Sequence, residues 1–315
     1  MKTIILGGGM FGFAILKHLG ENNPQEEFYV YERDEGVFNS LKTKRENPYF
    51  FKWTQLPENI MFEENVEENI WEYDLIIVAI PAQFVIVSVA NFREKLKSWV
   101  TILNLSKGIN NETLQTIWEW LEERLEWKDY NYWVLSGWMI AGELVEQKIL
   151  GADIAINNRE IGSKLQKLFQ SENLKINLTK ASTKSVELFG ALKNITAISI
   201  WYYMWKWLAY SSLWYYLCRL LEEEKELIKI LGWGEYFEFS DYSLGWDIIA
   251  TCFWNSRNKY LWELLGKWNS AEKALEIIKK ENKTAEWYHT LKAVAEIIEG
   301  KEGFEEIKKL VKILY

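Results

Sequence analysis

The stretch KTIILGGGMFGFAILKHL, residues 2–19, decides the fold. A short apolar run leads into the spacing G-x-G-x-x-G, and a segment with helical periodicity follows. In such a unit Gly7 allows the tight turn, Gly9 lets a pyrophosphate approach the backbone, and Gly12 lets the helix pack on the strand. The N–H groups at the helix N-terminus then face the phosphates. The pattern predicts a dinucleotide site, and a simple Gly-rich turn is the alternative.

Apolar strands alternate with helices over the first 180 residues. We expect strands at residues 2–6, 27–31, 60–62, 74–80, 100–105, 132–135, 153–157 and 175–178, and helices at 13–19, 82–96, 112–125 and 159–169. After Ser182 the periodic segments are helical. These observations predict an α/β protein. A Rossmann-type, mainly parallel sheet domain would span residues 1–180, and an all-helical substrate and catalytic domain would span 181–315.

Charged residues follow two strands of the predicted sheet. Glu32 and Arg33 come directly after the second strand. An acidic residue there would hold the ribose hydroxyl of NAD, whereas an arginine would accept the 2′-phosphate of NADP, so both cofactors stay open. Lys107 follows a later strand, at the edge where open α/β sheets bind ligands. A solvated turn is the alternative for each group.

The composition excludes several classes of function. The net charge of -8 argues against a nucleic-acid partner. Only Cys218 and Cys252 are available for a disulfide, which is typical of a reducing cytoplasm. The two histidines, His18 and His289, belong to no metal-ligating cluster. No apolar run reaches the roughly 18 residues of a membrane span, and the N-terminus lacks a signal-peptide pattern. We therefore expect a cytoplasmic protein without a metal.

A lysine interrupts an apolar helical run in the second domain. Lys193 and Asn194 follow the segment ELFGAL, whose apolar residues recur at helical spacing. A buried lysine is costly unless it is paired or functional, and burial lowers its pKa towards neutrality, which suits proton transfer. A surface lysine that extends along an amphipathic helix is the alternative.

Polar residues gather again between residues 243 and 258. Asp247 and Thr251 are four residues apart, so a helix would place them on one face. Arg257 and Asn258 offer a guanidinium fork and an amide, which suit a phosphate group. Helix caps or surface residues are the alternatives, but four such groups within twelve residues favour a site.

Together these segments resemble the NAD(P)-dependent glycerol-3-phosphate dehydrogenase family. The resemblance runs over almost the whole chain and keeps the family's order of motifs. The matching segments are residues 7–12, the turn NLSKG at 104–108, residues 135–143, the helix GALKN at 190–194, residues 244–258 and residues 285–290. The resemblance implies reduction of dihydroxyacetone phosphate to sn-glycerol 3-phosphate, which feeds glycerophospholipid synthesis, by an enzyme that is a homodimer.

The same resemblance implies roles for individual residues. Lys193 would be the general acid and base, supported by Asp247, Lys107 and Thr251. The residues expected to bind the phosphorylated substrate are Lys107, Gly137, Asn194, Ser256, Arg257 and Asn258. Those expected to bind NAD or NADP are Gly7, Gly9, Met10, Phe11, Gly12, Arg33, Lys107, Ala141, Arg257 and Glu286.

Two other functions fit parts of the pattern. A β-hydroxyacid or ketopantoate-type reductase shares the architecture and also uses a lysine, but the Arg257–Asn258 pair favours a phosphorylated substrate. A catalytically impaired nucleotide-binding protein would keep the glycine turn and lose the chemistry. The presence of Lys193, Asp247 and Arg257 argues against this second alternative.

Tryptophan is unusually frequent, with 18 residues against 18 glycines. Several tryptophans stand where the family has glycine, namely Trp201, Trp205, Trp207, Trp246, Trp262, Trp268 and Trp287, and Trp138 stands where the family has proline. The codon UGA is read as tryptophan in one variant code and as glycine in some bacterial lineages. We hypothesise that many of these tryptophans are glycines in the gene's true product. A genuinely Trp-rich, divergent protein is the alternative.

Overall fold

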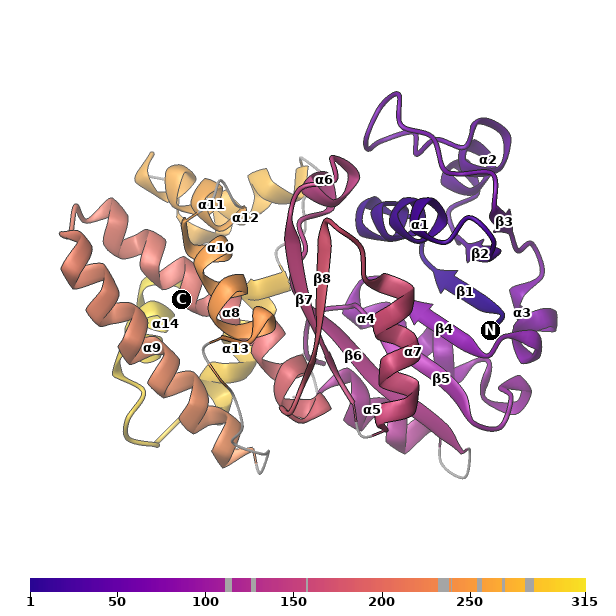
Figure 1. Cartoon of the computed structure of the whole chain (residues 1–315). Coiled ribbons are helices and arrows are strands. Elements are labelled where there is room, and N and C mark those ends of the chain that lie inside the picture. The colour runs from indigo at the N-terminus through magenta and orange to yellow at the C-terminus, as the bar shows by residue number, and fades with distance from the viewer. Residues whose placement is uncertain are drawn as a thin grey trace.

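An eight-stranded sheet forms the first half of the molecule (Figure 1). The computed structural model describes residues 1–110, 115–125, 129–156, 158–231, 238, 240–253, 257–267, 270–280 and 286–315. The strands are β1 (Thr3–Leu6), β2 (Phe28–Tyr31), β3 (Ile60–Phe62), β4 (Leu75–Val78), β5 (Val100–Asn104), β6 (Tyr130–Trp138), β7 (Leu150–Ala155) and β8 (Leu174–Thr179). Their order is β3-β2-β1-β4-β5-β6-β7-β8, and only the β6–β7 pairing is antiparallel.

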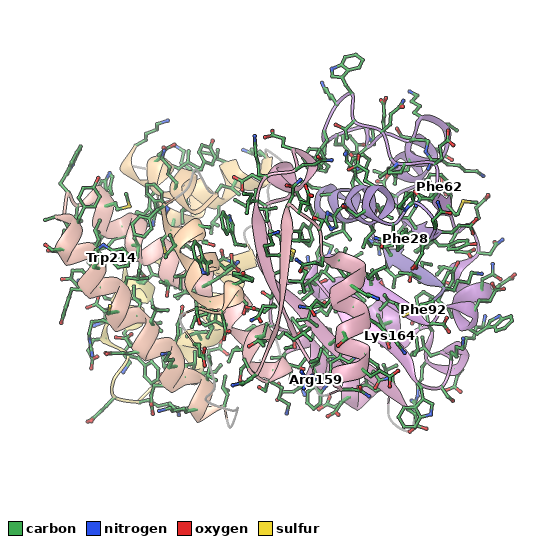
Figure 2. All side chains as sticks on the ribbon, viewed as in Figure 1. Phe28, Phe62, Phe92, Arg159, Lys164 and Trp214 are labelled. Carbon is green, nitrogen blue, oxygen red and sulfur yellow. The ribbon has the colours of Figure 1, made fainter. Side chains whose placement is uncertain are left out.

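Helices cover both faces of this sheet, as expected for a parallel sheet. One face packs against α1 (Met10–Asn22), α2 (Glu35–Lys44), α6 (Ala141–Val145) and α7 (Arg159–Phe169). The other face packs against α3 (Val66–Asn69), α4 (Ala82–Ala90) and α5 (Ile117–Arg124), with the short turns η1 (Ile70–Glu72) and η2 (Arg93–Lys95). Figure 2 shows Arg159 and Lys164 projecting from the outer side of α7.

The described residues from Thr183 onward form helices, packed around α8 (Thr183–Trp205), and no strand. The other helices are α9 (Tyr210–Ile230), η3 (Tyr242–Trp246), α10 (Asp247–Phe253), α11 (Arg257–Gly266), α12 (Ala271–Lys280), α13 (Glu286–Ile297) and α14 (Glu305–Leu314). In Figure 1 this part lies beside β7 and β8, and it contains the C-terminus, whereas the N-terminus lies in the sheet part. The predicted fold class is confirmed. The boundary at residue 180 stays a prediction, and it falls between the end of β8 and the start of α8.

Three helices have bounds that differ from the sequence-based prediction. α1 begins at Met10 rather than residue 13, because the helix starts inside the glycine turn. α4 ends at Ala90, and a separate turn at Arg93–Lys95 follows. α5 begins at Ile117, where Thr116 and Glu119 form a capping box that sets the start. Residues 111–114, which the prediction placed in or beside that helix, lie outside the described part.

The backbone at several tryptophans favours glycine. Among the described residues six non-glycines have a positive φ, and three of them are Trp53 (71°), Trp99 (64°) and Trp207 (58°). All three indoles are exposed, so no burial of the ring compensates for the left-handed backbone. Trp262 differs, because it is buried and its Nε1 donates to the Ile198 carbonyl oxygen at 2.6 Å. The codon hypothesis stays a prediction, and these positions allow a test of it.

Membrane insertion would need a long and strongly apolar helix. Among the described residues no helix combines the length and the apolar composition that a span requires.

Candidate active site

The glycine turn has the shape of a phosphate cradle at the carboxyl edge of β1. Gly7 has φ of 109°, and its N–H donates to the Tyr31 carbonyl oxygen at 2.9 Å. A Cβ at Gly12 would lie 1.9 Å from the Gly7 carbonyl oxygen, so α1 packs directly on the turn. A Cβ at Gly9 would meet no described atom within 4 Å. The space over Gly9 and the N-terminus of α1 therefore fit a dinucleotide pyrophosphate.

Glu32 and Arg33 lie beside this turn in different ways. Glu32 Oε2 accepts from the Gly8 N–H at 2.7 Å, and its Oε1 accepts from the Asp34 N–H at 2.9 Å. Arg33 stacks its guanidinium on the Phe84 ring, 5.0 Å from the ring centre, at the surface beside the turn. The Glu32 carboxylate thus binds two backbone N–H groups, while the Arg33 guanidinium lies against the Phe84 ring. This arrangement leaves NAD and NADP both open.

Lys107 lies in the turn after β5, and the buried Asn104 stabilises this turn. Asn104 Oδ1 accepts from the Ser106 N–H at 2.9 Å, and Ser106 Oγ donates to the Ile80 carbonyl oxygen at 2.5 Å. These bonds direct Lys107 towards the helical part of the molecule. Its Nζ donates to the Gly137 carbonyl oxygen at 3.3 Å and lies 3.4 Å from Asp247 Oδ2.

Lys193 is buried, so the surface-lysine interpretation is wrong. It lies in the middle of α8 and forms an ion pair with Asp247, the first residue of α10. The side chains of the pair are 6% and 5% exposed, whereas Lys107 beside them is 29% exposed. Asp247 Oδ2 therefore contacts two ammonium groups, one buried and one partly exposed.

The electrostatics of this cluster favour proton transfer. Burial lowers the pKa of Lys193 well below that of an ordinary lysine, because an ammonium loses its hydration there. Asp247 opposes this effect by attracting the ammonium, and Lys107 adds to it by repulsion. A lysine with a lowered pKa can release and recover a proton near neutral pH.

Other predicted site residues lie near the cluster of Lys193, Asp247 and Lys107 or near the glycine turn. Thr251 Oγ1 donates to the Asp247 carbonyl oxygen at 2.6 Å, one turn along α10. Asn194 follows Lys193 on α8. Gly137 is near the end of β6, and Ala141 opens α6, which packs against α1. Met10 and Phe11 form the first turn of α1.

Four predicted site residues cannot be placed in full. Ser256 lies outside the described residues. Trp268, which stands where the family has glycine, also lies outside them. Arg257 and Asn258 open α11, and Glu286 opens α13, but their side chains lie outside the described part. The described residues hold no group of three or more His, Cys, Asp or Glu side chains that could bind a metal.

Sequence reasoning missed several buried carboxylates, and two of them contact elements of the site. Glu187 lies nearly two turns before Lys193, and its Oε1 accepts from Asn104 Nδ2 and from the Tyr132 hydroxyl, both at 2.8 Å. Asp153 lies inside β7 and reaches η3. The signal was a single acid within an otherwise apolar strand or helix, which is the same kind of signal that revealed Lys193.

A largely apolar cavity of about 680 Å³ lies between α6 and α10. Trp138 and Trp246 help to line it, and their rings stack with centroids 6.0 Å apart. Neither Lys193 nor Lys107 lines this cavity. The two indoles therefore occupy space beside the cluster rather than within it.

Comparison with known proteins identifies the family. The N-terminal model of the NAD-dependent glycerol-3-phosphate dehydrogenases matches residues 2–162, and their C-terminal model matches residues 183–315. The chain belongs to this family. It is an NAD(P)-dependent oxidoreductase that acts on a CH–OH group, with NAD or NADP as its cofactor. This membership favours glycerol-3-phosphate dehydrogenase activity over the alternative reductases.

Family relatives are similar along most of the chain. The glycerol-3-phosphate dehydrogenase [NAD(P)+] of Myxococcus xanthus is 29% identical over 97% of this chain and 89% of its own length. The chloroplastic glycerol-3-phosphate dehydrogenase [NAD(+)] of rice is 29% identical over 93% of this chain, which spans only 66% of the rice protein.

Solved structures with this fold include the Plasmodium falciparum glycerol-3-phosphate dehydrogenase. It has a TM-score of 0.89 and 24% identity, and the match covers all of this chain and 91% of that one. The Saccharomyces cerevisiae glycerol-3-phosphate dehydrogenase has a TM-score of 0.86 and 19% identity, with coverage of 100% and 96%. At these identities the likeness supports the fold.

Proposed function

We propose that this protein reduces dihydroxyacetone phosphate to sn-glycerol 3-phosphate and thereby supplies glycerophospholipid synthesis. The observation that carries the proposal is the buried Lys193–Asp247 pair, which lies against Lys107 at the carboxyl edge of the sheet. The names of the relatives support the substrate, and the glycine turn supports the cofactor.

The chain's residues fit a nicotinamide dinucleotide. Gly7, Gly9 and Gly12 with the first turn of α1 would hold its pyrophosphate. Arg33, Ala141, Arg257 and Glu286 would contact other parts of it. When bound, the nicotinamide supplies the hydride for the reduction.

Lys193 acts as the proton donor. As the substrate carbonyl is reduced, negative charge develops on its oxygen, and the Lys193 ammonium donates a proton to that oxygen. In the oxidative direction neutral Lys193 accepts the proton of the hydroxyl. The lowered pKa makes both protonation states accessible near neutral pH.

Neighbouring groups orient this acid and bind the substrate. Asp247 holds the Lys193 ammonium in place, and Thr251 fixes the first turn of α10 through its bond to the Asp247 carbonyl oxygen. Lys107, held at the Gly137 carbonyl oxygen, and Asn194 bind the polar groups of the substrate. Ser256, Arg257 and Asn258 bind its phosphate.

Three further properties belong to the proposal. The family resemblance supports a homodimer, and the low cysteine content supports a cytoplasmic location. The start of α8 at Thr183, directly after β8, supports a boundary near residue 180 between the nucleotide domain and the catalytic domain.

Oxidation of NADH and NADPH provides the test of this function. The purified protein should oxidise either cofactor with dihydroxyacetone phosphate and only weakly with dihydroxyacetone, because the phosphate-binding residues would be unused. Comparable rates with both ketones, or turnover of ketopantoate instead, would contradict the proposal. The glycine-restored chain should be assayed in parallel with the chain as written.

A further inference from the structure

A buried aspartate of the sheet caps a helix of the C-terminal part. Asp153 lies in the middle of β7 and is fully buried. Its Oδ2 accepts from the backbone N–H of Ser243 at 2.5 Å, and its Oδ1 accepts from Asn177 Nδ2 on β8 at 2.9 Å. Burial raises the pKa of Asp153, and the hydrogen bonds from Ser243 and Asn177 oppose this rise. A buried carboxyl group is costly without such bonds, which indicates that its position is specified.

The capped residue lies in the first turn of the helical segment that carries Asp247. Ser243 is the second residue of the π-helical turn η3, and α10 continues from that turn without a break. The first N–H groups of a helix have no partner within the helix, so Asp153 satisfies one of them from the sheet. Single π-helical turns next to an α-helix occur frequently at functional sites.

The contacts around Asp153 pack η3 tightly against β7. The Tyr242 ring lies against Gly151 of β7, where an added Cβ would be 2.9 Å from the ring. Asp153 is paired in register with Ser136 of β6, directly beside Gly137, whose carbonyl oxygen accepts from Lys107. One pair of strands therefore holds both the helix start and the second lysine of the cluster.

We propose that Asp153 is a positioning residue. It fixes the start of the helix that carries Asp247, so that the Asp247 carboxylate contacts the Lys193 ammonium. This inference rests on the proposed role of the Lys193–Asp247 pair in catalysis. Without the cap, the η3 turn can relax to α-helical spacing. That change rotates Asp247, which follows η3 directly, away from the Lys193 ammonium.

The test compares substitutions at Asp153 with one on the neighbouring strand. Asp153→Ala should lower kcat for dihydroxyacetone phosphate about 10- to 100-fold, because small misplacements of catalytic groups have effects of this size. The KM for NADH should stay within about twofold, because the glycine turn lies on β1 and α1, away from η3. Asp153→Asn keeps an acceptor for the Ser243 N–H and should retain most of the activity. The control is Thr179→Val, which alters a buried residue of β8 whose hydroxyl oxygen accepts from the Ala181 N–H.

A second readout separates positioning from a general loss of stability. The charged groups against Lys193 are Asp247 and Lys107, with the Cys252 thiol buried nearby. Displacement of Asp247 should therefore move the pH at which Lys193 reacts with an amine-acylating reagent to a lower value. If Asp153 had only a structural role, Asp153→Ala would lower Tm. The kcat measured at temperatures below Tm and the pH at which Lys193 is acylated would both stay unchanged, and that result would overturn the proposal.

The two proposals can fail separately. If the parent protein does not reduce dihydroxyacetone phosphate but Asp153→Ala shifts the acylation pH of Lys193, the proposed function fails and the positioning role holds. If the parent is active and Asp153→Ala matches it in kcat and acylation pH, the positioning role fails. Asp153→Val, whose β-branched side chain suits a strand, replaces the alanine variant if that variant does not fold.

Discussion

Lys193 and Asp247 lie on different helices, 54 residues apart, and form an ion pair whose side chains are 6% and 5% exposed. An isolated charge at this depth would be strongly unfavourable, so each residue depends on the other. The pair joins the centre of α8 to the start of α10, and Lys107 approaches it from the sheet at 3.4 Å.

Replacement of Lys193 removes the proposed proton donor. Lys193→Ala should reduce kcat for dihydroxyacetone phosphate by at least about 100-fold, in the range found for general acid–base groups. The Kd for NADH, measured by fluorescence titration, should stay near that of the parent. Lys206→Ala, at the exposed end of the same helix, is the control and should be fully active. Unchanged turnover in Lys193→Ala would overturn the assigned role.

Replacement of the aspartate should change the pH profile. Asp247 raises the pKa of Lys193, so Asp247→Asn should lower that pKa further. In the proposed mechanism reduction needs protonated Lys193, so its rate should fall as pH rises through the pKa of Lys193. The alkaline limb of kcat for reduction should therefore move to lower pH, whereas oxidation should stay active at lower pH than in the parent. An unchanged limb would show that another group titrates.

Alanine substitutions at two glycines of the glycine turn should have different effects on stability. Gly9→Ala meets no described atom, so Tm should change little, while the Kd for NADH should rise about tenfold or more because a methyl group enters the phosphate cradle. Gly12→Ala collides with the Gly7 carbonyl oxygen and should lower Tm as well. Normal NADH binding by Gly9→Ala would place the cofactor elsewhere.

Exposed tryptophans offer a test of the codon hypothesis. Trp207 is 93% exposed and has φ of 58°, so Trp207→Gly should stabilise the fold by about 1 kcal/mol. Trp214 is also exposed but lies within α9, as Figure 2 shows, and Trp214→Gly should destabilise the fold by about 0.5 kcal/mol. Urea unfolding measures both values. UGG codons at Trp246 and Trp287 would exclude the misreading of UGA at those positions.

A buried acid makes stability depend on pH. Burial raises the pKa of Glu224 to about 8, although Thr196 donates to its Oε1 at 2.5 Å. Its folded-state pKa is above the unfolded value, so its stabilising contribution is complete below about pH 4.5 and is lost as pH rises through about 8. Relative to the parent, Glu224→Gln should therefore gain up to about 1.4 kcal/mol per pH unit across that range.

The matched control for this acid is Glu222→Gln. Glu222 is exposed and pairs with Arg219 at 2.9 Å, so its substitution should change the unfolding free energy little at any pH. Chemical denaturation at several pH values measures both variants. A parallel pH response of Glu224→Gln and the parent would contradict the raised pKa.

The sequence by itself determined the fold class and most of the elements. Strand composition and helical periodicity are local properties, so β3 and α7 were predicted to the residue. The glycine spacing predicted the cofactor-binding turn, because Gly7 has a positive φ, Gly12 leaves no room for a Cβ, and Gly9 leaves open space for the phosphates. The apolar run around Lys193 and the spacing of Asp247 and Thr251 singled these residues out, and resemblance to the family then implied their roles.

The resemblance grouped Lys193 with Asp247 and Lys107, but only the tertiary structure showed that these charges meet. The burial of Lys193, its pairing with Asp247 and the approach of Lys107 depend on contacts between segments 54 to 140 residues apart. The contact of Asp153 with Ser243 was not predicted for the same reason, because the two residues are 90 positions apart. Periodicity reports which face of an element is apolar, whereas the pKa of a buried group depends on neighbours that chain packing brings together.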